Sequence, residues 1–324
     1  MPPITSRLPS QRTISISLIF VVLFYVAYIV VTGHDALLGA LGRLQTSDWL
    51  IILCCSLVNY LLRFSRWHFY LQRLGYQVAV FPSLAYYIAG FCLTTTPGKA
   101  GETIRSLYLH QHGVKFSASL AAFFSERFLD VIVVAGLASL SLLQFVEYRS
   151  VISGFIIILF LLLVLFAYGN SHRLIEKYLE HIQVKILKRI LEWLFFFLRH
   201  TRQLFAFRSM LLALLLGNIA WLIQGVAFLY LLQLFSVEMN AWVALGIFAA
   251  SLLAGAISFI PGGVGTTEAA MAFLLIASGV EQQTALVIPI ITRIASLWFA
   301  VSLGSLAILL LSLSGIKLHS PEKH

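Results

Sequence analysis

Charged side chains are scarce in this sequence, at 11% of 324 residues. Soluble domains carry roughly 25%, so this chain lacks the polar surface that a water-soluble fold needs. Hydrophobic residues make up 60% instead, and several apolar runs reach the roughly 18–20 residues that cross a hydrocarbon core about 30 Å thick. The composition excludes a soluble globular protein and indicates a polytopic membrane protein.

Cysteine is also rare, and Cys54, Cys55 and Cys92 show neither CxxC spacing nor a nearby histidine cluster. All three fall in apolar segments, so we expect small buried hydrophobic side chains and no disulfide framework or metal site. A phosphate-binding loop is missing too, because the Gly98-Lys99 pair is followed by alanine and not by Ser or Thr. Without a recognisable hydrolase constellation, we expect no metal, no cofactor and no enzymatic activity.

Apolar runs define six expected full spans, near 14–32, 49–70, 117–146, 151–169, 210–235 and 283–314. Two further apolar stretches, 83–112 and 241–281, are each interrupted midway by a Pro-Gly motif. Residues 83–96 would form a helix only about 21 Å long, too short to cross the membrane. We therefore expect an all-α protein with six full spans and two Pro-Gly-broken re-entrant hairpins, although 241–260 is long enough to span fully.

Lysine and arginine are distributed unevenly, and residues 236–282 contain neither. When the spans are threaded in order, only Arg43 and Arg149 fall on one side and the other basic residues fall on the opposite side. Because basic residues concentrate in cytoplasmic loops, we expect both termini in the cytoplasm. The net charge of +9 then suits an anionic membrane face and not nucleic acid.

An amphipathic segment, about 172–207, precedes the fifth span. Within 173–198, apolar residues including Ile175, Ile182 and Ile186 recur at helical spacing against charged residues. The pattern predicts a helix lying in the cytoplasmic interface. Packing on another cytoplasmic helix is the alternative.

The Pro-Gly motif occurs twice. PGKAGE, which ends at Glu102, is matched by PGGVGTTE, which ends at Glu268. A Gly-Val pair follows each glutamate by 11 residues, and Arg127 and Arg293 follow their glutamates by 25. We infer two repeats, about 49–146 and 210–314, within a single membrane domain that comprises residues 1–324.

The repeats are expected to have opposite orientations, because an odd number of full spans separates the two motifs. Inverted repeats with broken helices are typical of transporters. A break in mid-membrane frees backbone groups that lipid cannot satisfy, so it must be buried in protein or line a polar cavity. The helix that begins after such a break attracts anions at its N-terminus.

Arg127 and Arg293 each lie ten residues into a predicted span, about 15 Å deep by helical rise. An arginine at that depth costs roughly 2.5–3.5 kcal/mol on insertion scales. Glu126 and Asp130 flank Arg127 and could form a purely structural ion pair with it.

Arg293 has no acid within four residues, so Glu268 is its expected partner, and by symmetry Glu102 would serve the arginine of the first repeat. Alternatively, the arginines bind a lipid phosphate, which suits a planar guanidinium. Lys99 and Arg105 would add to such an anion site. We expect one central polar cavity shared by both repeats.

Arg63 and Arg66 close the second span, beside Trp67. We interpret the two arginines as cytoplasmic interface anchors and Trp67 as a residue of the aromatic belt. Binding of a lipid headgroup is the alternative for the arginines.

RFSRW (63–67), SERFLD (125–130) and TRIAS (292–296), with the two Pro-Gly motifs, carry a resemblance that covers nearly the whole chain. The chain resembles the lysylphosphatidylglycerol synthase transmembrane-region family, the flippase-like membrane domain also found in the multiple peptide resistance factor. The resemblance implies a bacterial or archaeal inner-membrane protein that moves lipids between leaflets. The soluble domain that attaches the amino acid in the full synthase has no counterpart in this sequence, so we do not expect aminoacyl transfer.

The candidate translocation site comprises the two motifs and the charged residues near them: Pro97, Gly98, Lys99, Gly101, Glu102, Arg105, Glu126, Arg127, Asp130, Pro261, Gly262, Gly263, Gly265, Glu268 and Arg293. The leading hypothesis is a transporter for an anionic phospholipid or a polyprenyl-type lipid. An intramembrane enzyme acting on lipid-linked substrates and an accessory subunit of a cell-envelope pathway are the alternatives. A homo-oligomer or a partner from envelope biosynthesis is left open.

Overall fold

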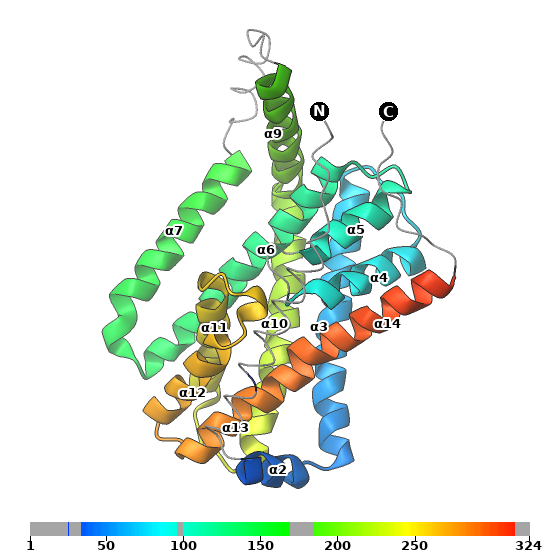
Figure 1. The fold of residues 1–324 in the computed structure, drawn as a ribbon. Helices are drawn as coiled ribbons and strands as arrows, with labels where there is room; N and C mark the ends of the chain where they lie inside the picture. Colours follow the sequence, from blue (N-terminus) through cyan, green and yellow to red (C-terminus); the bar gives the residue numbers. More distant parts are fainter. Residues whose placement is uncertain (1–24, 26–33, 96–99, 169–184, 315–324) are drawn as a thin grey trace.

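The computed structural model describes Tyr25 and residues 34–95, 100–168 and 185–314, and the elements in these ranges are all helical (Figure 1). The predicted all-α fold is confirmed for this part of the chain. Apart from Tyr25, the predicted first span lies outside the described residues, and so do Pro97, Gly98 and Lys99.

The first repeat follows the short helix α2 (His34–Arg43). Its elements are α3 (Thr46–Arg73), α4 (Val80–Ala89), the 3₁₀ turn η1 (Gly90–Leu93), α5 (Ala100–His110), α6 (Phe116–Ala138) and the 3₁₀ turn η3 (Ser139–Leu143). A further 3₁₀ turn, η4 (Val146–Tyr148), leads into α7 (Arg149–Tyr168).

The second repeat follows α9 (Lys185–Leu204). Its elements are α10 (Phe207–Leu234), α11 (Ala241–Ile257), the 3₁₀ turn η5 (Pro261–Gly263), α12 (Thr266–Ala277), α13 (Gln282–Arg293), the π-helical turn η6 (Ile294–Trp298) and α14 (Phe299–Leu313). The order of elements therefore matches that of the first repeat, with α13, η6 and α14 in the place of α6 and η3.

Local sequence sets several of these boundaries. Asn240 caps α11, because its side-chain oxygen accepts a hydrogen bond from the backbone amide of Trp242 at 2.9 Å. The side chain of Asp48, in the first turn of α3, accepts one from the backbone amide of Gln45 at 2.8 Å. Such caps satisfy amides that have no partner within their own helix.

The two longest single helices, α3 and α10, each have 28 residues and pack along one another. In Figure 1, α3 rises from α2 toward α4, whereas α10 descends from α9 toward α11. The diagonal helices also run oppositely, with α6 descending toward α7 and α14 rising from α13. These directions are those expected of two inverted repeats.

Four described helical segments are long and apolar enough to cross a membrane: Thr46–Arg73, Arg149–Ala167, Phe207–Leu234 and Gln282–Leu313. They correspond to four of the six predicted spans. The predicted span 117–146 is α6 followed by 3₁₀ turns, and α6 contains three charged residues near its middle.

The four hairpin helices are shorter. The longest, α11, has 17 residues, or about 26 Å at 1.5 Å per residue. All four are shorter than the roughly 30 Å of a hydrocarbon core, and the re-entrant geometry of the hairpins stays a prediction.

Each hairpin packs against the last long helix of the other repeat, which is α6 in the first repeat and α14 in the second. The second-repeat helix α11 contacts α6 and η3, and the first-repeat elements α4 and η1 contact α14. Glycines permit both approaches: a Cβ atom added to Gly246 would lie 2.1 Å from the backbone nitrogen of Ser141, and one added to Gly304 would lie 2.3 Å from that of Cys92. The repeats are therefore interlocked and do not form separate units.

The predicted amphipathic segment is helical from Lys185, and residues 169–184 lie outside the described part. α9 packs on α6 and α7, where Phe197 meets Phe124 with ring centroids 5.5 Å apart. In Figure 1, α9 stands above α10 in nearly the same direction. The amphipathic pattern did not predict that α9 packs against α6 and α7.

Cys54 is exposed, and Cys55 and Cys92 are half-buried. The prediction of buried cysteines is therefore wrong. In a helix that faces hydrocarbon, an apolar run does not tell which of its residues are covered by protein.

Inversion of the repeats predicts opposite sidedness for two equivalent connections. In a cysteine-free background, we expect Gln77→Cys, between α3 and α4, to react with a membrane-impermeant maleimide only from the cytoplasmic side. Glu238→Cys, between α10 and α11, should react only from the opposite side. Both positions are exposed, so labelling reports sidedness and not burial. Reaction of both from the same side would contradict the inverted arrangement.

Candidate functional site

A group of buried charges joins three helices of the first repeat. We call it the arginine cluster; α3, α5 and α6 contribute its members, which are Arg63, Arg66, Arg105, Glu126, Arg127 and Asp130.

Glu126 is fully buried at the centre of the arginine cluster. Its carboxylate accepts hydrogen bonds from Nη2 of Arg127 at 2.6 Å and from the hydroxyl of Tyr87 at 2.9 Å. Guanidinium nitrogens of Arg66 and Arg63 lie 3.6 and 3.7 Å from the same oxygen. Nη1 of Arg105 on α5 lies 3.7 Å from the other oxygen. One carboxylate therefore interacts with charges from three helices and with a tyrosine from a fourth.

Asp130 lies one turn further along α6. It accepts hydrogen bonds from Nη2 of Arg66 at 2.7 Å and from the indole nitrogen of Trp221 at 3.1 Å. Nη2 of Arg127 is 3.3 Å away. Since Trp221 belongs to α10, Asp130 also links the two repeats.

The predicted roles of the RFSRW residues are wrong. Arg66 is fully buried and bonded to Asp130, and Trp67 is buried as well. Neither is an interface residue. Arg63 is also largely buried, with 11% of its side chain exposed. The charges on α6 explain the difference: α3 continues to Arg73, so both arginines lie within the helix and pair there with the buried carboxylates.

Arg105 lies on aromatic rings. Its guanidinium carbon is 4.0 Å from the ring centre of Tyr87 and 5.4 Å from that of Trp67, which are cation–π distances. Its Nε donates a hydrogen bond to the backbone oxygen of Tyr87 at 3.2 Å. A Cβ atom added to Gly90 would lie 2.3 Å from this Nε, so the glycine provides the space that Arg105 occupies.

The second repeat contains a simpler ion pair. Nε of Arg293 donates to Glu268 at 2.9 Å, and both side chains are buried. Glu268 also accepts from the backbone amide of Gly265 at 2.8 Å and from the hydroxyl of Tyr25 at 2.8 Å. The predicted pairing of Arg293 with Glu268 is confirmed. Glu268 additionally caps α12, because the Gly265 amide precedes that helix.

The PGGVG turn brings its backbone to Arg293. Gly262, Gly263 and Gly265 have φ angles of +65°, +63° and +91°, a region that favours glycine. The resulting turn directs the carbonyl oxygen of Gly262 at Arg293, whose Nη2 donates to it. The arginine therefore satisfies a backbone group that the helix break leaves without a helical partner.

One cavity of about 690 Å³ connects the two repeats. Arg63, Arg105 and Arg127 line it from the first repeat and Arg293 from the second, and most of the remaining lining is apolar or aromatic. With 30% of its side chain exposed, Arg127 is more accessible than Arg63. Arg127 and Arg293 thus share the wall of a single cavity, as the inverted repeat predicts.

The turns of the two hairpins meet beside this cavity. Thr95, which follows η1, and Gly262, in η5, are close enough that a Cβ atom at Gly262 would lie 3.4 Å from Cγ2 of Thr95. Leu93, Thr94, Pro261 and Gly263 belong to the cavity lining. The cavity is therefore bounded by both helix breaks.

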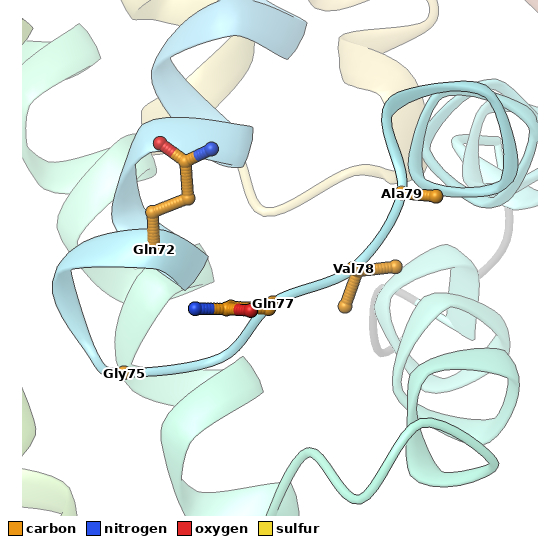
Figure 2. Close-up of a pocket in the computed structure, with 5 residues that line it drawn as sticks. All are labelled: Gln72, Gly75, Gln77, Val78 and Ala79. Atoms are coloured by element: carbon orange, nitrogen blue, oxygen red, sulfur yellow. The ribbon is translucent and has the colours of Figure 1, made fainter.

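A second pocket, of about 510 Å³, lies at the connection between α3 and α4 (Figure 2). Its lining contains no charged side chain and none of the predicted site residues: Gln72, Gly75, Gln77, Val78 and Ala79. Figure 2 shows these residues around an open turn. The pocket does not present the convergent charges of the cavity between the repeats.

The structure assigns the predicted site residues to two groups. Those that line the cavity are Arg105, Arg127, Pro261, Gly262, Gly263 and Arg293. Glu126, Asp130 and Glu268 lie behind the arginines and hold them, and Gly265 shapes the turn. Gly101 and Glu102 lie in the first turn of α5, and the expected approach of Glu102 to Arg127 falls outside what the structure describes.

Several residues of the site were missed in the sequence. Tyr87, Trp221 and Tyr25 hydrogen-bond the three carboxylates, but their positions carry no motif. Asn59, Arg63 and Arg66 share one face of α3, and this helical spacing is the signal that could have identified α3 as part of the site. Among the described residues, no three His, Cys, Asp or Glu side chains are grouped as metal ligands.

The Glu268–Arg293 pair predicts a strong energetic coupling. Replacing either residue by alanine leaves the other charge buried, which costs about 3–5 kcal/mol for such pairs. We expect Glu268→Ala and Arg293→Ala each to lower the free energy of unfolding by this order, measured by denaturant titration in detergent. The double variant should lose clearly less than the sum. Additive losses would show that the two charges do not depend on one another.

Gly217 on α10 predicts a second effect on stability. A Cβ atom there would lie 2.8 Å from Nη1 of the buried Arg66, so Gly217→Ala should displace an arginine that holds Asp130 and destabilise the protein. Gly136→Ala on α6 is the matched control, because a Cβ atom there meets nothing within 4 Å. The control should gain up to about 1 kcal/mol from helix propensity. Equal unfolding midpoints for the two variants would contradict this packing.

Comparison with known proteins identifies a family and two relatives. Residues 13–304 match the family described as the lysylphosphatidylglycerol synthase TM region. A UPF0104 membrane protein of Methanothermobacter thermautotrophicus is 26% identical over 310 residues, which cover 88% of this chain and 90% of the relative. Another, of Methanocaldococcus jannaschii, is 23% identical over 249 residues, which cover 72% of this chain and 100% of the relative. With both Pro-Gly motifs and the paired arginines inside the matched range, this multi-pass membrane protein belongs to the lysylphosphatidylglycerol synthase TM region family.

Proposed function

We propose that this protein moves an anionic lipid, a phospholipid or a polyprenyl-type lipid, between the two leaflets of the inner membrane. The observation that carries the proposal is the single cavity lined by arginines from both repeats. In this proposal both termini are cytoplasmic, and the anionic lipid is the partner of the cavity.

The chemistry of the lining favours a lipid phosphate. A guanidinium presents a rigid fork of donors that fits phosphate oxygens in a bidentate manner. Arg127 is the accessible member of the arginine cluster, and Arg63 also lines the cavity. The apolar remainder of the lining suits the part of a lipid that stays in hydrocarbon, which a small hydrated anion would not need.

The carboxylates behind the arginines support reversible binding. Glu126, Asp130 and Glu268 keep the guanidinium groups in place and offset part of their charge. A headgroup would therefore exchange its water for arginines that are already held, at a smaller cost than ordering free side chains. Because uniformly tight binding would trap the lipid, the site should bind it only moderately.

The two hairpins offer a means of alternating access. Their turns meet at Thr95 and Gly262, and each hairpin packs on the last long helix of the other repeat. Rocking of one repeat against the other would open the cavity first to one leaflet and then to the other, as in other inverted-repeat transporters.

We propose that no covalent step accompanies this movement. A general acid or base must reach the proton that it transfers. Glu126 and Glu268 are fully buried and bonded to arginines and tyrosines, so they support the arginines and do not face the cavity. A lipid should leave the protein chemically unchanged.

Leaflet exchange in liposomes tests the proposal. We expect the reconstituted protein to accelerate exchange of labelled phosphatidylglycerol over protein-free vesicles. Arg127→Ala should slow it on the order of tenfold, the loss of one charged hydrogen bond. Arg127→Lys, which keeps the charge without the fork, should lie between. Arg149→Ala is the matched control, since Arg149 is exposed and does not line the cavity.

Three outcomes would contradict the proposal. Exchange at the protein-free rate for phospholipids and polyprenyl phosphates, with ion gradients supplied, would favour an accessory subunit. A chemically altered lipid in the mass spectrum would favour an enzyme. Equal slowing by Arg127→Ala and Arg149→Ala would show that the cavity takes no part in moving the lipid.

A further inference from the structure

Phe259 has an unusual position at the edge of the cavity. It lies between α11 and η5 in the break of the second hairpin, and it belongs to the cavity lining. Its side chain is nevertheless 93% exposed. It therefore forms part of the outer rim of the cavity and not of its interior.

The backbone at Phe259 is strained. Its φ angle is +55°, which is rare for a residue other than glycine and an outlier for a bulky one. Strain of this kind persists only where the surrounding structure enforces it, and it concentrates at functional sites. The residues on either side supply the constraint: the Ser258 hydroxyl accepts from the amide of Ile260 at 3.2 Å, and the carbonyl of Ile260 accepts from the amide of Gly263 at 2.8 Å.

Burial changes from one part of the cavity lining to another. The side chains of Arg293 and Arg63 are 7% and 11% exposed and that of Arg127 is 30% exposed, so the cationic part is largely enclosed. Phe259, in contrast, is almost fully exposed. The cavity thus has a largely enclosed cationic part and an open aromatic residue at its rim, the division that a lipid with one charged group and long chains requires.

We propose that Phe259 is a chain-binding residue: it holds an acyl or prenyl chain at the rim while the lipid phosphate reaches the arginines. The inference rests on the proposed function and adds the place where the chain leaves the cavity for the hydrocarbon. An aromatic ring on this rim packs against a chain that stays in the hydrocarbon while the headgroup lies in the cavity. The strained turn keeps the ring pointed outward. If α11 continued as a relaxed helix, the side chain at this position would point in another direction.

Chain length and headgroup binding can be separated experimentally. The probes are dihexanoyl, dioctanoyl and didecanoyl phosphatidylglycerol, which share a headgroup, and the measurement is their binding to the full-length protein in detergent by native mass spectrometry. We expect wild-type affinity to rise with chain length. Phe259→Ala should weaken didecanoyl binding on the order of tenfold, the loss of one aromatic contact, and should leave dihexanoyl binding nearly unchanged.

Three variants serve as controls. Arg127→Ala should weaken all three lipids by the same factor, because it acts on the phosphate. Phe273→Ala should change nothing: Phe273 is 64% exposed on α12 of the same hairpin but does not line the cavity. Phe259→Leu, which keeps an apolar side chain, should recover most of the chain-length dependence. Unchanged dihexanoyl binding by Phe259→Ala shows that the alanine variant is folded.

The outcomes distinguish this inference from the proposed function. If Phe259→Ala weakens every chain length equally, or has no more effect than Phe273→Ala, the role of Phe259 is wrong while an effect of Arg127→Ala still supports an anionic-lipid site. If the wild-type protein binds none of the lipids, the proposed function is wrong and this inference with it.

Discussion

A guanidinium in the middle of a membrane protein needs a counter-charge close by, and this fold is arranged around that need. Glu126 provides it at a point where α3, α4 and α6 meet, and Asp130 extends the pairing to Trp221 on α10. Removing either carboxylate would leave three arginines with one acid in place of two, which is costlier than losing an equivalent apolar contact. Two acids of α6 therefore help to fix the position of α3.

The same principle is used differently in the second repeat. There a single pair, Glu268 and Arg293, closes the helix break: the acid caps α12 and the arginine satisfies the carbonyl of Gly262. The first repeat distributes its charge over four arginines and two acids among the described side chains. The two halves of the cavity thus differ in electrostatics although their helices correspond.

Much of the architecture could be predicted from the sequence, because apolar runs and Pro-Gly breaks act locally. The hairpins 83–112 and 241–281 were located to within a few residues of α4 to α5 and α11 to α12. Glu268 was identified as the partner of Arg293 because it closes the repeated Pro-Gly motif and Arg293 has no acid within four residues. Arg63 and Arg66 were misplaced, since an arginine near the expected end of an apolar run gives the same sequence pattern whether it faces headgroups or buried carboxylates. The difference depends on α6, which is distant in the sequence.

The sequence by itself determined that the chain is an all-helical membrane protein with two copies of one motif. Hydropathy and helix-breaking residues act on the chain within about one turn or one span, so a local pattern is enough to recognise them. Tertiary structure decided the other contacts of the buried charges. Three-dimensional packing brings Tyr87 to Glu126, Trp221 to Asp130 and Tyr25 to Glu268, and it places the arginines of both repeats on one cavity. Hydrogen bonds and ion pairs act over a few ångströms between residues that may be hundreds apart in the chain, so no local pattern records them.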